Sequence, residues 1–266
     1  MSIVLLDHVR PVGPARRDPM PVVKTVFYTL DISARFLVAI ALGRGTVARA
    51  DALLDGYWRR IFSSGNARLV VEGREHFTRP SIVVTNHTSL LDIPALMGAV
   101  PGSMRMVLKE ELTKVPVWGP ALVASGFVPV TRGTREKAIE QLGAAQRTFD
   151  QGVHVWVAPE GTRSKKGELG PFKKGAFHLA RSLRAPLVPG WIDGASRIVP
   201  NGALDAGYHQ TVTVRFGPAI EPIVDGRRRS AEEMMRDARA AILALGGRPP
   251  EPVAESAPIE AEGARV

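Results

Sequence analysis

A histidine and an aspartate five positions apart are the side chains of this 266-residue chain best suited to acid–base chemistry. They lie in the segment NHTSLLD, residues 86–92, and His87 is the only one of the six histidines with an aspartate at that offset. A histidine that donates one ring N–H to a carboxylate keeps its other ring nitrogen available as a general base. The pattern therefore predicts that Asp92 orients His87. The alternative is a surface histidine beside a helix-capping aspartate.

The offset also sets a condition on the local structure. Five residues along a regular helix place two side chains about 140° apart, so this pair can meet only where the chain turns. The run SIVVT, residues 81–85, predicts a buried strand, and Ile93–Ala99 predicts a helix. His87 therefore falls at a strand-to-helix loop, where Asn86 is suited to support the turn.

Two further predicted strands end in a cation. Lys109 follows one of them and Arg132 follows the next. Two cations at the same end of neighbouring strands suit a phosphate group. Taken singly, either side chain is equally well explained as a solvated loop charge.

Polar residues also follow the predicted strand that ends at Val157. The segment PEGTRS, residues 159–164, places Glu160, Gly161, Thr162 and Arg163 in a row. The segment FKKGA, residues 172–176, opens a predicted helix, where exposed backbone amides and lysines attract an anion.

Composition narrows the possible chemistry. The chain has no cysteine, which excludes a thiolate nucleophile, a disulfide and a cysteine-ligated metal. Its net charge of +9 favours an anionic partner such as a lipid headgroup, a phosphorylated substrate, an acidic carrier protein or nucleic acid. With 6% aromatic residues and no recognisable nucleic-acid module, we expect no nucleic-acid partner.

Short β-branched runs alternate with helical patterns over residues 65–247. Such alternation predicts an α/β layered domain with a mixed, largely parallel sheet flanked by helices. Predicted strands are Arg68–Val71, Ile82–Thr85, Met104–Leu108, Phe127–Val130, Val153–Val157, Leu187–Ile192 and Thr211–Phe216. Predicted helices are Ile93–Ala99, Arg135–Phe149, Lys174–Leu183 and Ala231–Leu245. Residues 248–266 are rich in Pro, Glu and Ala, which predicts a disordered tail.

Two amphipathic helices are predicted over residues 22–64, after an irregular, proline-punctuated arm at 1–21. Each apolar stripe either packs on the rest of the chain or lies in a membrane interface, with Tyr57 and Trp58 at headgroup depth. The longest uncharged run in this region, Phe36–Gly43, is far shorter than the roughly 18–20 residues that a span needs. The first residues do not predict a secretory signal.

In this order and spacing, the blocks NHTSLLD, GFVPVTR, PEGTRS followed by FKKGA, and the LVP strand resemble the glycerophospholipid acyltransferase family. The resemblance covers roughly residues 67–200. It implies that His87 is the general base and Asp92 its partner. It also implies that a further set of residues binds or borders the acceptor: Lys109, Arg132, Glu160, Gly161, Thr162, Arg163, Lys173 and Gly175.

The resemblance implies transfer of a fatty acyl group to the hydroxyl of 1-acylglycerol-3-phosphate in phospholipid biosynthesis. The donor would be acyl-CoA or an acylated carrier protein, with no metal and no other cofactor. With no cysteine and no serine in a nucleophile-elbow setting, direct attack by the acceptor hydroxyl is favoured over an acyl-enzyme. Another lysolipid acceptor, or a non-catalytic lipid-binding protein of the same fold, is the alternative.

These substrates also predict a location. A lysophospholipid acceptor lies in a bilayer, so the helical pair at 22–64 would associate with membrane lipids without spanning them. We expect a peripheral or monotopic protein on the cytoplasmic face of the cell inner membrane.

Overall fold

A computed structural model of the chain describes residues 2–5, 17–130, 135–164, 167–207 and 209–249. Within these ranges, eight strands form one sheet in the order β1-β3-β10-β8-β4-β7-β5-β6. Their bounds in that order are Ile3–Leu5, Arg68–Glu72, Thr211–Phe216, Leu187–Asp193, Ile82–Thr85, His154–Val157, Met104–Lys109 and Val128–Val130. The pairs β1–β3 and β8–β10 are antiparallel and the other five pairs are parallel. The predicted mixed, largely parallel sheet is confirmed.

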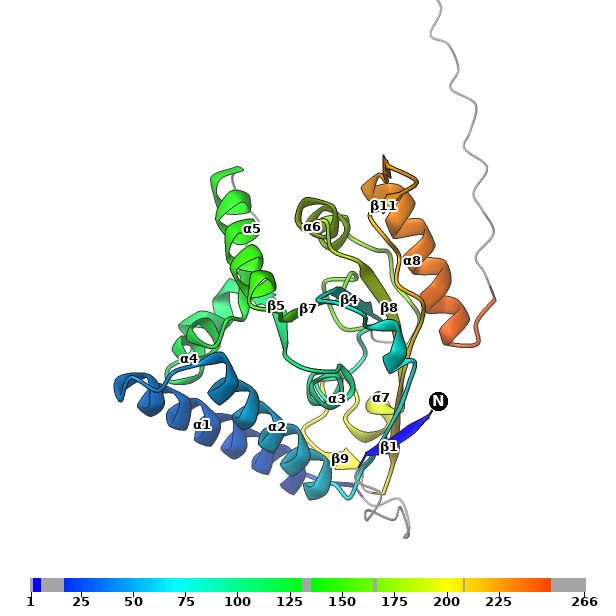
Figure 1. The fold of residues 1–266 in the computed structure, drawn as a ribbon. Helices are drawn as coiled ribbons and strands as arrows, with labels where there is room; N and C mark the ends of the chain where they lie inside the picture. Colours follow the sequence, from blue (N-terminus) through cyan, green and yellow to red (C-terminus); the bar gives the residue numbers. More distant parts are fainter. Residues whose placement is uncertain (1, 6–16, 131–134, 165–166, 208, 250–266) are drawn as a thin grey trace, which may run out of the picture.

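Helices cover both faces of this sheet (Figure 1). On one face lie α5 (Arg135–Asp150), α6 (Gly175–Leu183) and α8 (Ala231–Leu245). On the other lie α2 (Val47–Ser64), α3 (Asp92–Ala99) and the short α7 (Ala195–Ile198). Strand β4 shows how alternation feeds both cores, because Val83 packs with the second group while Ile82 and Val84 pack with the first.

Short elements complete the described part of the chain. A 3₁₀ turn at Arg74–His76 follows β3, and another at Glu110–Lys114 leads into α4 (Trp118–Ala124). Two small ladders pair β2 (Arg17–Asp18) with β9 (Ala206–Gly207), and β11 (Ile223–Val224) with β12 (Arg227–Arg228).

The expected irregular arm at residues 1–21 needs correcting where it is described. Ile3–Leu5 forms edge strand β1 against β3, Arg17–Asp18 forms β2, and helix α1 already begins at Met20. The prolines do not prevent this, because the apolar run at 3–5 precedes Pro11 and the edge of the sheet supplies its hydrogen-bond partners. Of the predicted tail at 248–266, residues 250–266 lie outside the described ranges.

The two N-terminal helices differ in how much of their apolar surface is buried. Helix α2 packs on the domain through Ala50, Trp58, Ile61 and Phe62, and its Asp51 accepts a hydrogen bond from buried Arg105 at 2.8 Å. Trp58 and Tyr57 therefore lie inside the protein rather than at headgroup depth, since Trp58 is 2% exposed and the Tyr57 hydroxyl meets Thr29 at 3.0 Å.

Helix α1 (Met20–Ala41) lies outside α2 and packs inward through a mixed face whose buried residues are Pro21, Ser33, Phe36 and Ala39. Ser33 is buried and Thr29 bonds to Tyr57, whereas the apolar stripe predicted from the sequence faces outward. Large apolar side chains exposed along α1 are Met20, Val23, Val26, Phe27, Leu30, Val38 and Ile40. Helix α1 therefore buries apolar residues on its inner side and also exposes an apolar stripe, with the exposed charges Lys24 and Arg35 near it. In the described residues, no helix is both long and apolar enough to cross a bilayer.

Candidate active site

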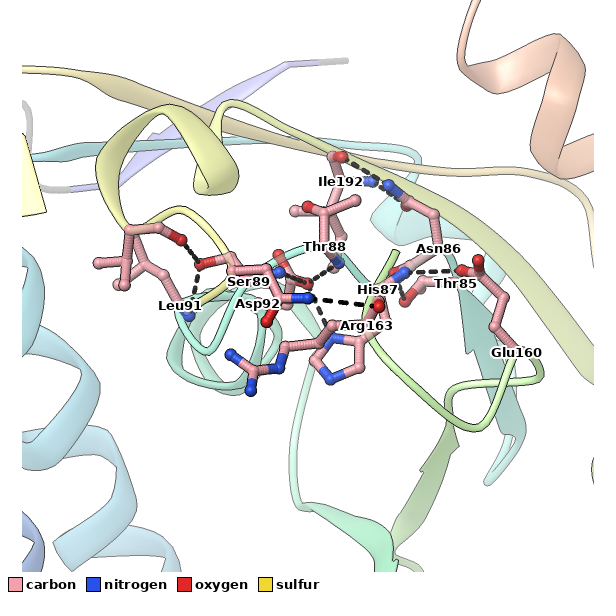
Figure 2. A network of polar contacts seen from close by, with 12 residues as sticks. Thr85, Asn86, His87, Thr88, Ser89, Leu91, Asp92, Glu160, Arg163 and Ile192 are labelled. Atoms are coloured by element: carbon pink, nitrogen blue, oxygen red, sulfur yellow. Dashed lines mark hydrogen bonds and ion pairs between the residues drawn. The ribbon is translucent and has the colours of Figure 1, made fainter. Parts of the chain in front are cut away.

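Parallel pairing of β4 with β7 brings the two most distinctive sequence blocks together. The register aligns Val84 with Val157, so the residues that follow these strands leave the sheet at the same edge. His87 comes two residues after β4, and the segment containing Glu160 and Arg163 comes after β7. Figure 2 shows the resulting network.

His87 and Asp92 form the predicted pair. The imidazole Nδ1 lies 2.8 Å from Asp92 Oδ2, and that same oxygen accepts the backbone N–H groups of Thr88 at 2.7 Å and Ser89 at 2.9 Å. Asp92 is fully buried as the first residue of α3, whereas the His87 side chain is 14% exposed. A carboxylate with three such donors fixes Nδ1 as the protonated ring nitrogen, which leaves Nε2 for chemistry.

The loop that carries this pair is held from several directions. The Asn86 side-chain amide makes two hydrogen bonds to the backbone of Ile192 in β8, at 2.7 and 2.9 Å. The Ser89 hydroxyl donates to the Val199 carbonyl at 2.7 Å, and the Ser164 N–H donates to the His87 carbonyl at 2.8 Å. Such a loop is preorganised, because its side chains are fixed before any substrate arrives.

Trp156 in β7 sets the position of the imidazole ring, and sequence reasoning missed it. Its indole meets the His87 ring edge-on, with ring centroids 5.4 Å apart at 88°. Its Nε1–H donates to the Thr85 hydroxyl at 3.1 Å. An aromatic residue inside a predicted strand carries no sign of such a role, which depends on the register between β4 and β7.

Glu160 approaches His87 from the backbone side. Its Oε1 accepts the His87 N–H at 3.1 Å and its Oε2 accepts the Gly170 N–H at 2.8 Å. Arg239 of α8 donates to the carbonyls of Leu169 and Gly170, and so fixes the same loop from behind. Burial raises the pKa of Glu160, which is 8% exposed. Both carboxyl oxygens thus bind the protein's own backbone, unlike the acceptor contact that the family resemblance implied for this residue.

Other predicted site residues belong to the loop that contains Glu160 or lie against it. The Arg163 side chain and the His87 ring point to the same side of the loop (Figure 2). Lys173 lies against Gly161, which has φ +71° and where a Cβ atom would meet the lysine Nζ at 2.5 Å. Thr162 is exposed beside them.

Two predicted positions lie on other elements, and a third is not described. Gly175 is the first residue of α6. Lys109 ends β5, which is separated from β4 by β7. Arg132 lies outside the described residues. Within the described ranges, no group of three or more His, Asp or Glu side chains is arranged to hold a metal ion.

Comparisons with known proteins agree with this arrangement. A family model described as Acyltransferase matches residues 68–193. A chloroplast 1-acyl-sn-glycerol-3-phosphate acyltransferase of Brassica napus is 34% identical over 161 residues, which cover 59% of this chain and 46% of the relative. The human 1-acyl-sn-glycerol-3-phosphate acyltransferase alpha is 40% identical over 125 residues, covering 46% and 44%. This chain spans about half the length of the curated relatives it matches.

The fold also has a solved counterpart. The 1-acyl-sn-glycerophosphate (LPA) acyltransferase PlsC from Thermotoga maritima superposes with a TM-score of 0.64 at 26% sequence identity. The match covers 86% of this chain and 97% of that one, so it includes most of the architecture described above.

Proposed function

This chain belongs to the glycerophospholipid acyltransferase family, and on that premise we propose that it is an enzyme that acylates 1-acylglycerol-3-phosphate, giving phosphatidic acid. The observation that carries the proposal is the contact of His87 Nδ1 with buried Asp92 Oδ2 at 2.8 Å. That contact makes Nε2 a general base at a loop with two neighbouring cations, Arg163 and Lys173.

The proposed step is direct acyl transfer. The acceptor hydroxyl oxygen attacks the thioester carbonyl carbon while His87 Nε2 takes the hydroxyl proton. The tetrahedral intermediate then collapses, the C–S bond breaks, and the departing thiolate receives the proton from the imidazolium. Asp92 holds the ring in place and stabilises its positive charge between the two events.

The acceptor assignment rests on chemistry and on similarity. Relatives from Brassica napus and Homo sapiens are named for 1-acyl-sn-glycerol-3-phosphate. A phosphomonoester beside the reacting hydroxyl needs cations, and we propose Arg163 and Lys173 for this role because Arg163 extends to the same side of the loop as His87 and Lys173 lies against Gly161 of that loop. Arg132 and Lys109 are proposed as further phosphate contacts. Another lysolipid acceptor remains the second candidate.

The donor is proposed to be acyl-CoA or an acylated carrier protein, with no metal or other cofactor. The net charge of +9 suits either, because the nucleotide phosphates of the first and the acidic surface of the second are anionic. An assay that crosses both donors with several lysolipid acceptors distinguishes these combinations.

The exposed face of α1 supports a peripheral location on a membrane, which we propose to be the cytoplasmic face of the cell inner membrane. Phe27 is 64% exposed and Val23, Val26 and Val38 are each 57–58% exposed, an arrangement that water disfavours and an interface accepts. Membrane lipids are therefore proposed partners as well as the source of the acceptor.

Replacing the base tests the function. In lipid vesicles containing 1-acylglycerol-3-phosphate, His87→Ala should lower the rate of acyl transfer about 10²- to 10⁴-fold, the usual contribution of a general base. His178→Ala, at an exposed histidine of α6, is the matched control and should leave the rate unchanged. Unaltered transfer by His87→Ala would contradict the proposal. Vesicle binding by the wild type without any transfer would favour a non-catalytic lipid-binding protein.

A further inference from the structure

The segment between β5 and β6 exposes apolar side chains that the catalytic network does not use. Val115 is 38%, Val117 41% and Val123 50% exposed, and all three belong to the turn and helix α4 that follow the 3₁₀ turn Glu110–Lys114. Lys114, which precedes them, is also exposed. We call Val115, Val117 and Val123 the valine surface.

The backbone of this segment is strained at Val117, whose side chain is exposed. Val117 has φ +67° and ψ −53°, and the Trp118 N–H donates to the Pro116 carbonyl at 2.7 Å, which closes a γ-turn of the rare, strained kind. Positive φ is unfavourable for a β-branched residue. Backbone strain of this kind costs free energy, and the exposed Val117 gains no burial to offset it. Strained residues of this kind are concentrated in functional segments.

The turn is also rigidly supported from beneath. A Cβ atom on Gly119 would lie 2.0 Å from the Thr113 carbonyl oxygen, so α4 begins in tight contact with the preceding 3₁₀ turn. Trp118 is half-buried and packs against the main core. This packing opposes a local rearrangement that would bury the valines, so their side chains stay exposed.

The valine surface belongs to a segment that packs beside α1, where Val123 and Phe36 line the same cavity. Helix α4 packs against α1, close to the end of α1 that turns into α2 (Figure 1). The nearby end of α1 exposes Val38, Ile40 and Leu42, and Arg44 follows in the turn. Apolar side chains with exposed basic residues beside them match the acyl and headgroup layers of an anionic bilayer.

We propose that the valine surface is a second membrane-contacting element, which enters the same bilayer interface as α1. This inference rests on the proposed membrane location of α1 and adds an orientation to it. A single helix lying in an interface leaves the attached domain free to roll about the helix axis. Two elements from different parts of the chain remove that freedom, and so hold the loop bearing His87 at one angle to the bilayer that contains the acceptor.

The test compares a set of three exposed aliphatic side chains with a pair of similar exposure elsewhere. Val115→Ser/Val117→Gly/Val123→Ser removes the surface, and glycine at 117 relieves the positive φ, so the turn itself is not destabilised by that change. Ile223→Ser/Val224→Ser is the matched control, since these residues are 42% and 46% exposed in the β11–β12 ladder, far from α1 (Figure 1). Sedimentation with vesicles of phosphatidylcholine and phosphatidylglycerol measures the partition coefficient.

The valine variant should partition about tenfold or more weakly than the wild type, as expected for losing apolar contacts, while the control partitions unchanged. Transfer to an acceptor in vesicles should fall with binding, whereas transfer to a detergent-dispersed acceptor should not. Phe27→Asp tests α1 separately. If Phe27→Asp weakens binding and the valine variant does not, the second element is wrong and the location of α1 stands. If neither weakens binding, the membrane location itself fails. Wild-type dimers that the valine variant abolishes would identify a self-association surface and overturn the proposal.

Discussion

Two histidines lie at opposite ends of neighbouring parallel strands, and their Nδ1 atoms have opposite hydrogen-bonding roles. His87 follows the carboxyl end of β4, and its Nδ1 meets the Asp92 carboxylate at 2.8 Å. His154 begins β7 at the amino end, and its Nδ1 accepts the Ser81 backbone N–H at 3.1 Å. The first ring must carry its proton on Nδ1, and the second must carry it on Nε2.

The difference shows that hydrogen-bond partners and burial together decide which histidine is useful as a base. His154 is 7% exposed, packs edge-on against Phe77 and is faced by a backbone donor. Burial lowers its pKa to about 4, so it stays neutral under ordinary conditions and serves the fold. His87 is paired with a carboxylate that orients its ring and leaves Nε2 available to accept a proton.

The largest predicted effect on this comparison follows from removing the negative charge of Asp92 beside His87. Asp92→Asn should lower kcat about 10²- to 10⁴-fold, because a neutral amide stabilises the imidazolium poorly. The fold should persist, since the asparagine oxygen can replace Oδ2 as the acceptor for Thr88 and Ser89. Steady-state kinetics and thermal unfolding of the same sample measure the two effects.

Asp225→Asn in the β11–β12 turn is the control for this change. Asp225 is exposed with φ +49°, a conformation that asparagine adopts readily. The control should match the wild type in both measurements. An Asp92→Asn enzyme with a normal kcat would mean that the two histidines do not differ in the way described.

The second prediction sharpens the description of His154. Its folded pKa of about 4 lies below the usual 6.5, so the unfolded chain binds the proton more readily between these values. The stabilising contribution of neutral His154 is therefore complete above pH 6.5 and is lost as the pH falls to 4. The full loss corresponds to about 3 kcal/mol in the free energy of unfolding. Urea unfolding at pH 7, 5.5 and 4 measures it.

Other groups also titrate over this range, so the change due to His154 is isolated by difference. His154→Asn keeps an acceptor for the Ser81 N–H and does not titrate. Its free energy of unfolding should fall less between pH 7 and 4 than that of the wild type. Parallel pH profiles for the two proteins would refute the assignment.

The smallest predicted effect concerns Glu160, whose carboxylate accepts the backbone N–H of His87. Glu160→Gln leaves one buried backbone N–H, of His87 or Gly170, facing an amide NH₂ group. An unsatisfied buried N–H costs about 1–3 kcal/mol. We expect lower kcat through displacement of the His87 backbone and an unchanged KM for the acceptor. Glu168→Gln, an exposed carboxyl in the same loop, is the control. A raised acceptor KM with normal kcat would instead support the acceptor contact that the family resemblance implied.

Much of the frame was predictable because it depends on local patterns. Ile82–Thr85, Thr211–Phe216 and Ala231–Leu245 have the predicted bounds, and the requirement for a turn between His87 and Asp92 is met by the loop that leads into α3. Periodicity and β-branching are local properties of the sequence, and they also indicate which residues of a strand or helix face the core.

The parts that were not predictable depend on contacts between distant segments. The apolar stripe of α1 was predictable from the sequence. The side of α1 that packs against α2 was not, because it depends on the contact between Thr29 and Tyr57. The role of Trp156 requires the β4–β7 register, and the two bonds of Glu160 require the loop fixed by Arg239. Helix α4, only seven residues long and entered through a γ-turn, gave no periodic signal.

The pairing of Asp51 with Arg105 has a consequence for anyone who would dissect this protein. Arg105 is 1% exposed within β5, and its charge is matched by a carboxylate on α2. Cutting the chain before residue 65 would remove that carboxylate and leave the guanidinium with the Ser125 and Met104 carbonyls as its acceptors, so we expect the remaining domain to be less stable. The helical pair is therefore part of the domain's own packing, and a change of membrane affinity is better made on the outer face of α1.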